Sequence, residues 1–261
     1  MAPIQQMLIG VGASKKTYVD DLFSTYVYTG DGSARSINNG VDLSGEGGLV
    51  WTKIRNQSYG HFLFNTVNGN GNYLRSDTSD TQATYATSGT NAGITAFNNN
   101  GYSLGADQSF QCLNYGSNDY SSWTFRKAKG FFDIVEYQGT GSAKTVAHSL
   151  GSVPGLILIK ATDSSENWRV YHKSLTGTHH LVLNLTNQVN TGAAHFNDTN
   201  PTASVFSVGT DDAVNQDGKN FIAYVFAGGE STAATARSVD FDGDDNLKTA
   251  GDNSFKFGTG D

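Results

Sequence analysis

An internal repeat is the feature of the sequence that most restricts the fold. Four segments of the first half of the chain recur in the same order in the second half. The matched segments are 28–35 (YTGDGSAR) with 137–144 (YQGTGSAK), 48–53 (GLVWTK) with 155–160 (GLILIK), 102–105 (YSLG) with 206–209 (FSVG), and 120–125 (YSSWTF) with 221–226 (FIAYVF). The offsets are 109, 107, 104 and 101 residues, so only loop lengths change between the copies. This pattern predicts a tandem duplication of a unit of about 105 residues.

The composition indicates that each unit is built from strands and turns. Glycine accounts for 31 of the 261 residues, and only 16% of the residues are charged, against about 7% and about 25% in average domains. Gly and Asn supply the positive φ angles that tight turns need. The segment 155–160 is a continuous apolar run of strand length, which suits a strand buried on both faces. We therefore expect an all-β fold of two jelly-roll-like β-sandwich modules in series.

The repeat also divides the chain into regions. We expect a segment over residues 1–27 that is too short to form a core alone, a first sandwich over 28–127 and a second over 128–229. Residues 230–261 begin with a linker of small residues and continue into strand-like sequence. Their pattern is typical of the first strands of a further β domain, whose remainder would lie beyond residue 261.

Charge and cysteine content exclude several classes of partner and site. The net charge is −7, from 17 basic and 24 acidic residues without a basic stripe, and phosphate binding requires clustered Lys and Arg. No segment approaches the roughly 20 apolar residues of a membrane span, and the apolar start lacks the basic residues of a secretory signal. The single cysteine, Cys112, can form no intramolecular disulfide. We predict no nucleic acid, membrane or cofactor as a partner.

Histidine and acidic clusters give little support to a metal site or a catalytic centre. His179 and His180 are adjacent, and neighbouring residues of a strand point to opposite faces. The acidic segment 240–245 (DFDGDD) lacks the spacing and the distal Glu of a helix–loop–helix calcium motif. Packed histidines and a solvated turn are the simpler interpretations. The acidic residues select no catalytic pair and no nucleophile motif is present, so we predict neither a metal site nor enzymatic activity.

Aromatic residues raise the alternative of carbohydrate binding, because sugar rings stack on Trp and Tyr in many β-sandwiches. The candidates for glycan contact are Tyr59, Tyr73 and Trp168, with Tyr85 as a further one. Another set, Trp51, Trp123, Tyr224 and Phe226, lies in apolar strands and is expected in the core.

Longer motifs run through almost the whole chain. They are 2–13 (APIQQMLIGVGA), 18–26 (YVDDLFSTY), 42–53 (DLSGEGGLVWTK), 97–105 (FNNNGYSLG), 123–133 (WTFRKAKGFFD), 148–155 (HSLGSVPG) and 226–237 (FAGGESTAATAR). Together they resemble the tail-fibre-like virion proteins of marine phages, including cyanophages. In such proteins, residues like 238–261 typically begin a laminin-G or concanavalin-like domain, so the resemblance implies such a domain, truncated, over 230–261.

The resemblance implies a structural role in a phage tail. The N-terminal segment would attach the fibre to proteins of the tail adaptor or nozzle region, and distal domains would contact the host. The anchoring residues would be Ile4, Met7, Leu8, Ile9, Lys15, Lys16 and Tyr18. The resemblance also implies a homotrimer, located in the virion and made in the host cytoplasm. The alternative is a carbohydrate-binding module that contacts host surface glycans directly.

Overall fold

Antiparallel strands supply almost all the regular structure in the computed structural model, which describes residues 18–85, 93–107 and 113–228. The elements of the first half are η1 Val19–Asp21, β1 Phe23–Thr29, β2 Arg35–Asn38, β3 Gly48–Ile54, β4 His61–Asn65, β5 Asn72–Arg75, β6 Ala83–Thr84, β7 Ile94–Asn98, β8 Gly101–Leu104 and β9 Asp119–Arg126. Those of the second half are β10 Phe132–Gln138, β11 Lys144–Ala147, β12 Pro154–Ala161, β13 Arg169–His172, β14 His179–Val182, β15 Asn190–Thr191, α1 Ala193–Phe196, β16 Val205–Val208, α2 Asp212–Asn215 and β17 Asn220–Ala227. The prediction of an all-β fold is confirmed.

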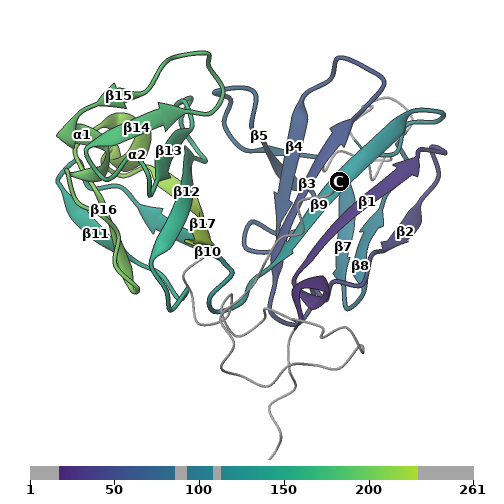
Figure 1. The fold of residues 1–261 in the computed structure, drawn as a ribbon. Coiled ribbons are helices and arrows are strands. Elements are labelled where there is room, and N and C mark those ends of the chain that lie inside the picture. Colours follow the sequence, from purple (N-terminus) through teal and green to yellow (C-terminus); the bar gives the residue numbers. More distant parts are fainter. Residues whose placement is uncertain (1–17, 86–92, 108–112, 229–261) are drawn as a thin grey trace, which may run out of the picture.

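Each half contains one large and one small antiparallel sheet. The large sheets have the strand orders β1-β9-β3-β4-β5-β6 and β10-β17-β12-β13-β14-β15, and the small sheets are β2-β8-β7 and β11-β16. The two large sheets therefore have the same topology when β1 is matched with β10 and β9 with β17 (Figure 1). The short helix α1 takes the place in the second half that β7 has in the first. The duplication remains an inference from the sequence, which this shared topology supports.

A separate apolar core lies between the large and the small sheet of each half. In the first half it includes Val50 of β3, Phe64 of β4 and Tyr102 of β8. In the second half it includes Ile157 of β12 and Phe206 of β16. Successive residues of a strand point to opposite faces, so every second side chain of a large sheet enters this core. Each half is therefore a β-sandwich.

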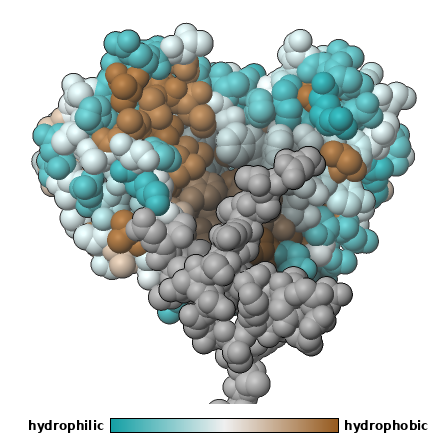
Figure 2. All heavy atoms as spheres, in the orientation of Figure 1, coloured by the Kyte–Doolittle hydropathy of each residue, from teal (hydrophilic) through white to brown (hydrophobic). Residues whose placement is uncertain are grey.

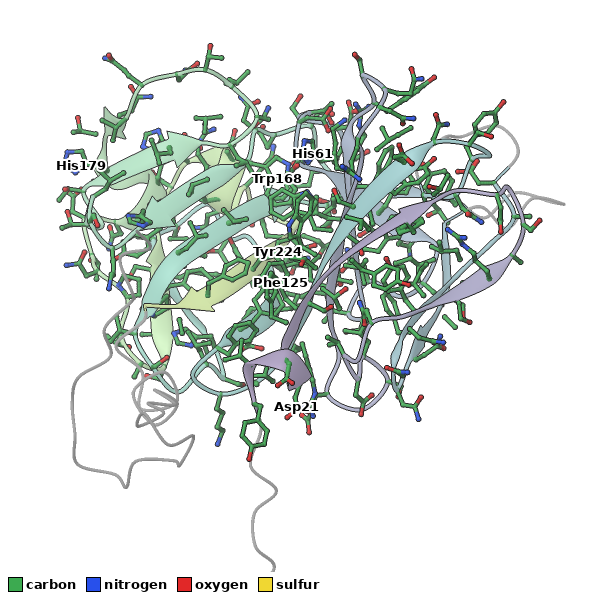
Figure 3. The ribbon with its side chains drawn as sticks, turned by 45° about the vertical axis from the view of Figure 1, so that its right-hand side comes forward. Asp21, His61, Phe125, Trp168, His179 and Tyr224 are labelled. Atoms are coloured by element: carbon green, nitrogen blue, oxygen red, sulfur yellow. The ribbon has the colours of Figure 1, made fainter. Side chains whose placement is uncertain are left out.

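A third core joins the two sandwiches, because the outer faces of the two large sheets pack against each other. It contains Leu49, Leu63 and Leu74 from the first half and Phe132, Ile134, Leu158, Trp168, Val170, Ile222 and Tyr224 from the second. Phe125, Trp168 and Tyr224 lie in a row between the two halves (Figure 3). Strand β12 is buried along nearly its whole length, as predicted for the run 155–160. The layers thus follow in the order small sheet, large sheet, large sheet, small sheet.

A buried asparagine fixes the same turn in both halves. In the first half, Asn114 Oδ1 accepts a hydrogen bond from the backbone N–H of Asp31 at 3.3 Å. In the second half, Asn215 Oδ1 accepts from the N–H of Thr140 at 2.9 Å, and its Nδ2 donates to the carbonyl of Gly209 at 2.6 Å. Both asparagines are completely buried. Their bonds replace the backbone partners that these turns lack.

A glycine and a tyrosine complete this arrangement in each half. A Cβ atom on Gly30 or Gly139 would lie 2.3 or 2.1 Å from a carbonyl oxygen of the facing loop, so only glycine fits. The hydroxyl groups of Tyr28 and Tyr137 each donate to a backbone carbonyl of the same loop at 2.7 Å. The YTG and YQG segments of the repeat are therefore explained by packing.

The structure changes one of the expected boundaries. Strand β1 begins at Phe23, so the expected boundary between residues 27 and 28 divides a strand that belongs to the first sandwich. Residues 23–27 are part of the folded unit because every residue of β1 pairs with β9. Residues 1–17 and 229–261, with most of the expected anchor and the expected C-terminal domain, lie outside the described residues.

Candidate functional site

The aromatic residues expected to contact glycans do not form a common platform. Trp168 is completely buried in the core between the sandwiches, where its Nε1 donates to the carbonyl of Arg75 at 2.8 Å. Tyr73 packs against the core of the first sandwich and stacks on Tyr85 at 4.4 Å between ring centroids. Only Tyr59 is exposed, at 42%. The expectation of a platform from Tyr59, Tyr73 and Trp168 is wrong, because the large sheet of the first half separates the cores that hold Tyr73 and Trp168.

Three of the four expected core aromatics lie in or against the core between the sandwiches. Tyr224 is fully buried, and the partly buried Trp51 and Phe226 pack against this core. Trp123 is half-buried, and its ring meets that of Trp51 edge to face at 6.4 Å. The Nε1 of Trp51 donates to Nδ1 of His61 at 3.3 Å.

Only one of the expected anchoring residues lies within the described part of the chain. Tyr18 is 53% exposed and precedes η1, where its backbone N–H donates to Asp21 Oδ2 at 2.7 Å. Its ring is available on the surface next to the start of β1. Ile4, Met7, Leu8, Ile9, Lys15 and Lys16 lie outside the described residues.

An open cavity of about 520 Å³ at the junction of the two sandwiches is the best candidate for a binding site. Its lining consists of Val67, Asn68 and Gln82 from the first half and Glu136, Tyr137, Gln138, Thr162, Asn220 and Phe221 from the second. The two halves are tied together here by a backbone hydrogen bond from Gln82 N to Thr162 O at 2.8 Å. Side-chain amides, a hydroxyl and a carboxylate dominate the lining.

The polar groups of the cavity are only partly engaged with one another. Asn68 Nδ2 donates to Gln82 Oε1, whereas Asn68 Oδ1 is buried and has no hydrogen-bond partner among the described residues. The Glu136 side chain is exposed to solvent. Tyr137 stacks on Phe221 with 5.2 Å between ring centroids, and both rings pack in the core of the second sandwich. A site of this kind offers both donors and acceptors to a ligand rich in hydroxyl groups.

A second cluster of polar side chains lies inside the second sandwich. His180 of β14 and His195 of α1 stack with 3.6 Å between ring centroids. Asp211 lies 3.4 Å from His195 Nε2 and 3.7 Å from the guanidinium of Arg169. Several nitrogens of these side chains are buried and have no hydrogen-bond partner in the part of the chain that the structure describes: Nδ1 of His180, both ring nitrogens of His195, and Nε and Nη1 of Arg169.

The surroundings of the stacked imidazoles keep them uncharged at neutral pH. Burial is the main reason that the pKa of His180 falls to about 4. The nearby His195 and Arg169 also lower this pKa, whereas Asp211 raises it. Burial also lowers the pKa of His195, against the opposing effect of Asp211. In the described part of the chain, no three His, Cys, Asp or Glu side chains are grouped so that they could hold a metal ion. The sequence does not reveal this pair, because 15 positions separate its two members.

Lys160 is a buried cation at the boundary of the two sandwiches. Its Nζ donates to the carbonyl oxygens of Ala161 at 2.7 Å and Ser164 at 3.4 Å. Burial lowers its pKa to about 8. The repeat contains the signal for this role, since the matching Lys53 donates to carbonyl oxygens of the loop after β3. We assign both lysines to holding the loop that follows their strand.

A family model described as a domain of unknown function, DUF7483, matches residues 19–236. The match includes both sandwiches, so the family domain corresponds to the joined pair and not to a single repeat. No curated protein and no solved structure is detectably similar to the chain. Among the described residues, no helix has the length and hydropathy needed to cross a membrane.

Proposed function

We propose that this chain, which belongs to the DUF7483 family, is a non-enzymatic structural module of a phage tail fibre. The sequence motifs provide the link to tail fibres, and the fold supports a mechanical role. The supporting observation is the core between the sandwiches, where Trp168, Tyr224 and Leu158 are buried between two large sheets. Because sheets packed in this way cannot rotate without exposing apolar surface, the two sandwiches act as one rigid spacer.

Under this proposal, the surface that matters is the one that meets neighbouring proteins of the particle. Figure 2 shows apolar atoms gathered on the second half over β12–β14, and Leu183, Leu185 and Val189 beside β14 are exposed. The N-terminal segment would join the tail, with Tyr18 at the start of the folded unit, and the region after residue 228 would carry the parts that reach the host.

Immunogold electron microscopy of purified virions tests this proposal directly. Antibodies raised against residues 19–228 should decorate the tail and leave the capsid unlabelled. Particles that lack the protein, or label confined to the capsid, would contradict the proposal. Antibodies against the major capsid protein provide the positional control.

Recognition of a saccharide in the cavity between the sandwiches is the second candidate function. The lining supports this candidate. The amides of Asn68 and Gln82 can donate hydrogen bonds to sugar hydroxyl groups and accept from them, and the carboxylate of Glu136 can accept.

Saturation-transfer NMR with a panel of oligosaccharides tests this second candidate. Binding through the cavity should be lost in Asn68→Ala and Glu136→Ala but retained in Tyr59→Ala, whose exposed ring is not part of the lining. If Tyr59→Ala abolishes the signal and the cavity variants do not, the ligand binds elsewhere on the surface. A panel without any signal removes the second candidate and leaves the structural proposal intact.

A further inference from the structure

Among the described residues, no strand pairs with the outer edge of β1. β1 is the last strand of its large sheet, and its partner there is β9. The bonds from Arg126 N to Leu22 O and from Gly30 N to Asn118 O, both 2.8 Å, set the alternation of the ladder. Even-numbered residues therefore turn their backbone groups toward β9, and odd-numbered residues turn theirs away. Within the described residues, the backbone groups of Thr25 and Val27 have no hydrogen-bond partner.

The side chains of β1 add no protection. The strand (FSTYVYT) contains no charged residue and no proline, and Val27 is 64% exposed. Natural sheets usually shield such an edge with charges, proline, bulges or a covering segment, because an open edge pairs with other strands. A seven-residue uncharged edge is thus the exception that needs a partner.

The matching strand of the second sandwich shows how the same edge is protected there. The repeat aligns Val27 of β1 with Glu136 of β10, and the Glu136 side chain is exposed. At the start of β10, the backbone N–H of Ala128 also donates to the carbonyl of Phe132 at 2.9 Å, and the N–H of Phe132 donates to the carbonyl of Ala128 at 3.1 Å. Among the described residues, the β10 edge therefore carries a charge and two backbone bonds at Phe132 that the β1 edge lacks.

We propose that β1 pairs antiparallel with β1 of a second copy of this chain, in a two-fold symmetric dimer centred on Tyr26. Tyr26 is the middle residue of β1, and this register places Thr25 of each copy opposite Val27 of the other. The unpartnered backbone groups then meet, as hydrogen-bonded pairs of an antiparallel ladder must. The pairs also join β-branched side chains, which stabilise sheets, and no like charges face each other.

The contacts at one end of the strand favour this central register. The guanidinium of Arg35 donates to the carbonyl of Thr29 at 2.7 Å and occupies that acceptor. Pairing through Thr25 and Val27 leaves this contact in place. The proposed β1–β1 dimer does not depend on the proposed tail-fibre function. Its symmetry is two-fold, whereas the sequence resemblance implies a three-fold assembly.

Light scattering after size-exclusion chromatography of the full chain tests the assembly. We expect a concentration-dependent dimer, and Val27→Glu, which introduces the residue found at the matching position of β10, should weaken it at least tenfold. Val153→Glu is the matched control, because it places the same charge on another exposed valine in a loop before β12. A monomer at all concentrations would overturn the proposal; it would be the result if another segment of the chain covered the edge. So would a dimer or trimer that Val27→Glu leaves unchanged.

Disulfide cross-linking tests the register. In a Cys112→Ser background, Tyr26→Cys should form a dimer on a non-reducing gel, because facing residues of a non-hydrogen-bonded pair have Cα atoms about 4.5 Å apart. Ser24→Cys is the control on the same face of β1, since the two copies of residue 24 would be about 13 Å apart along the strands. Equal cross-linking at both positions, or none at Tyr26→Cys, would contradict the proposed register.

Discussion

Single buried polar side chains carry much of the specificity of this fold. Asn215 donates to two carbonyl groups and accepts from one amide without any contact with water. Asn114 occupies the matching position in the first sandwich, where its bonds to Asp31 and Gly105 are longer, at 3.3 and 3.4 Å, and its bond to the carbonyl of Ser33 is 2.5 Å. Substitution of each asparagine therefore tests how much its turn depends on the buried side chain, and the expected loss of stability differs between the two.

Replacing Asn215 with alanine should lower the free energy of unfolding by about 3 kcal/mol, because buried backbone groups lose their partners. Asn114→Ala should cost less, since two of its three side-chain hydrogen bonds are longer than those of Asn215. Urea denaturation measures both changes. Asn187→Ala, at an exposed position, is the control and should stay within about 0.5 kcal/mol of the parent chain. Equal and negligible losses at all three positions would show that the turns do not depend on these side chains.

The stacked histidines predict a loss of stability in acid. The pKa of His180 is lowered from 6.5 to about 4 in the folded chain, so the unfolded chain binds more protons between these pH values. Stability is therefore complete above pH 6.5 and falls as the pH drops toward 4, by about 3 kcal/mol in total. Urea denaturation at pH 7.5 and 4.5 measures the difference.

Two variants locate the origin of this pH dependence. His180→Gln should remove most of it, because the glutamine side chain does not titrate. His179→Gln should preserve it, since His179 lies on the opposite face of the strand, toward solvent (Figure 3). The same acid dependence in both variants would place the titrating group elsewhere.

At the scale of elements, the two large sheets determine how the sandwiches associate. β12 and β13 supply Leu158 and Val170 to the core between the halves, Trp168 lies directly before β13, and β3 and β4 supply Leu49 and Leu63. Each large sheet is thus apolar on both faces. One face serves its own sandwich and the other serves the neighbouring one.

Trp168→Ala should destabilise the whole chain by about 3–5 kcal/mol, because it removes a fully buried side chain and leaves a cavity between the sheets. The loss should appear in the unfolding of both sandwiches. Intrinsic fluorescence and far-ultraviolet circular dichroism during denaturation measure it. Tyr59→Ala, an exposed aromatic, should have little effect, and a comparable loss there would refute this assignment of Trp168.

The sequence predicts the elements better than it predicts their partners. The repeat and the glycine content indicate an all-β chain, and the apolar run 155–160 indicates a strand covered on both faces. Nothing in a single strand says which sheet covers its second face, so Trp168 could be mistaken for a sugar platform. The His180–His195 pair and the cavity depend on segments far apart in the chain, and local patterns contain no signal for such contacts.

At the scale of the whole molecule, three apolar cores in succession make the joined sandwiches a single mechanical body. The family domain has the same extent, since its model matches residues 19–236. A rigid spacer of this kind is what the proposed role in a fibre requires. Such a spacer requires that the two halves share their stability.

Differential scanning calorimetry of the full chain measures this shared stability most directly. If the core between the sandwiches joins them into one unit, heating should give a single transition whose calorimetric and van't Hoff enthalpies agree. Two resolved transitions, or a calorimetric enthalpy about twice the van't Hoff value, would show that the sandwiches unfold independently. In that case the two halves would not form one rigid module.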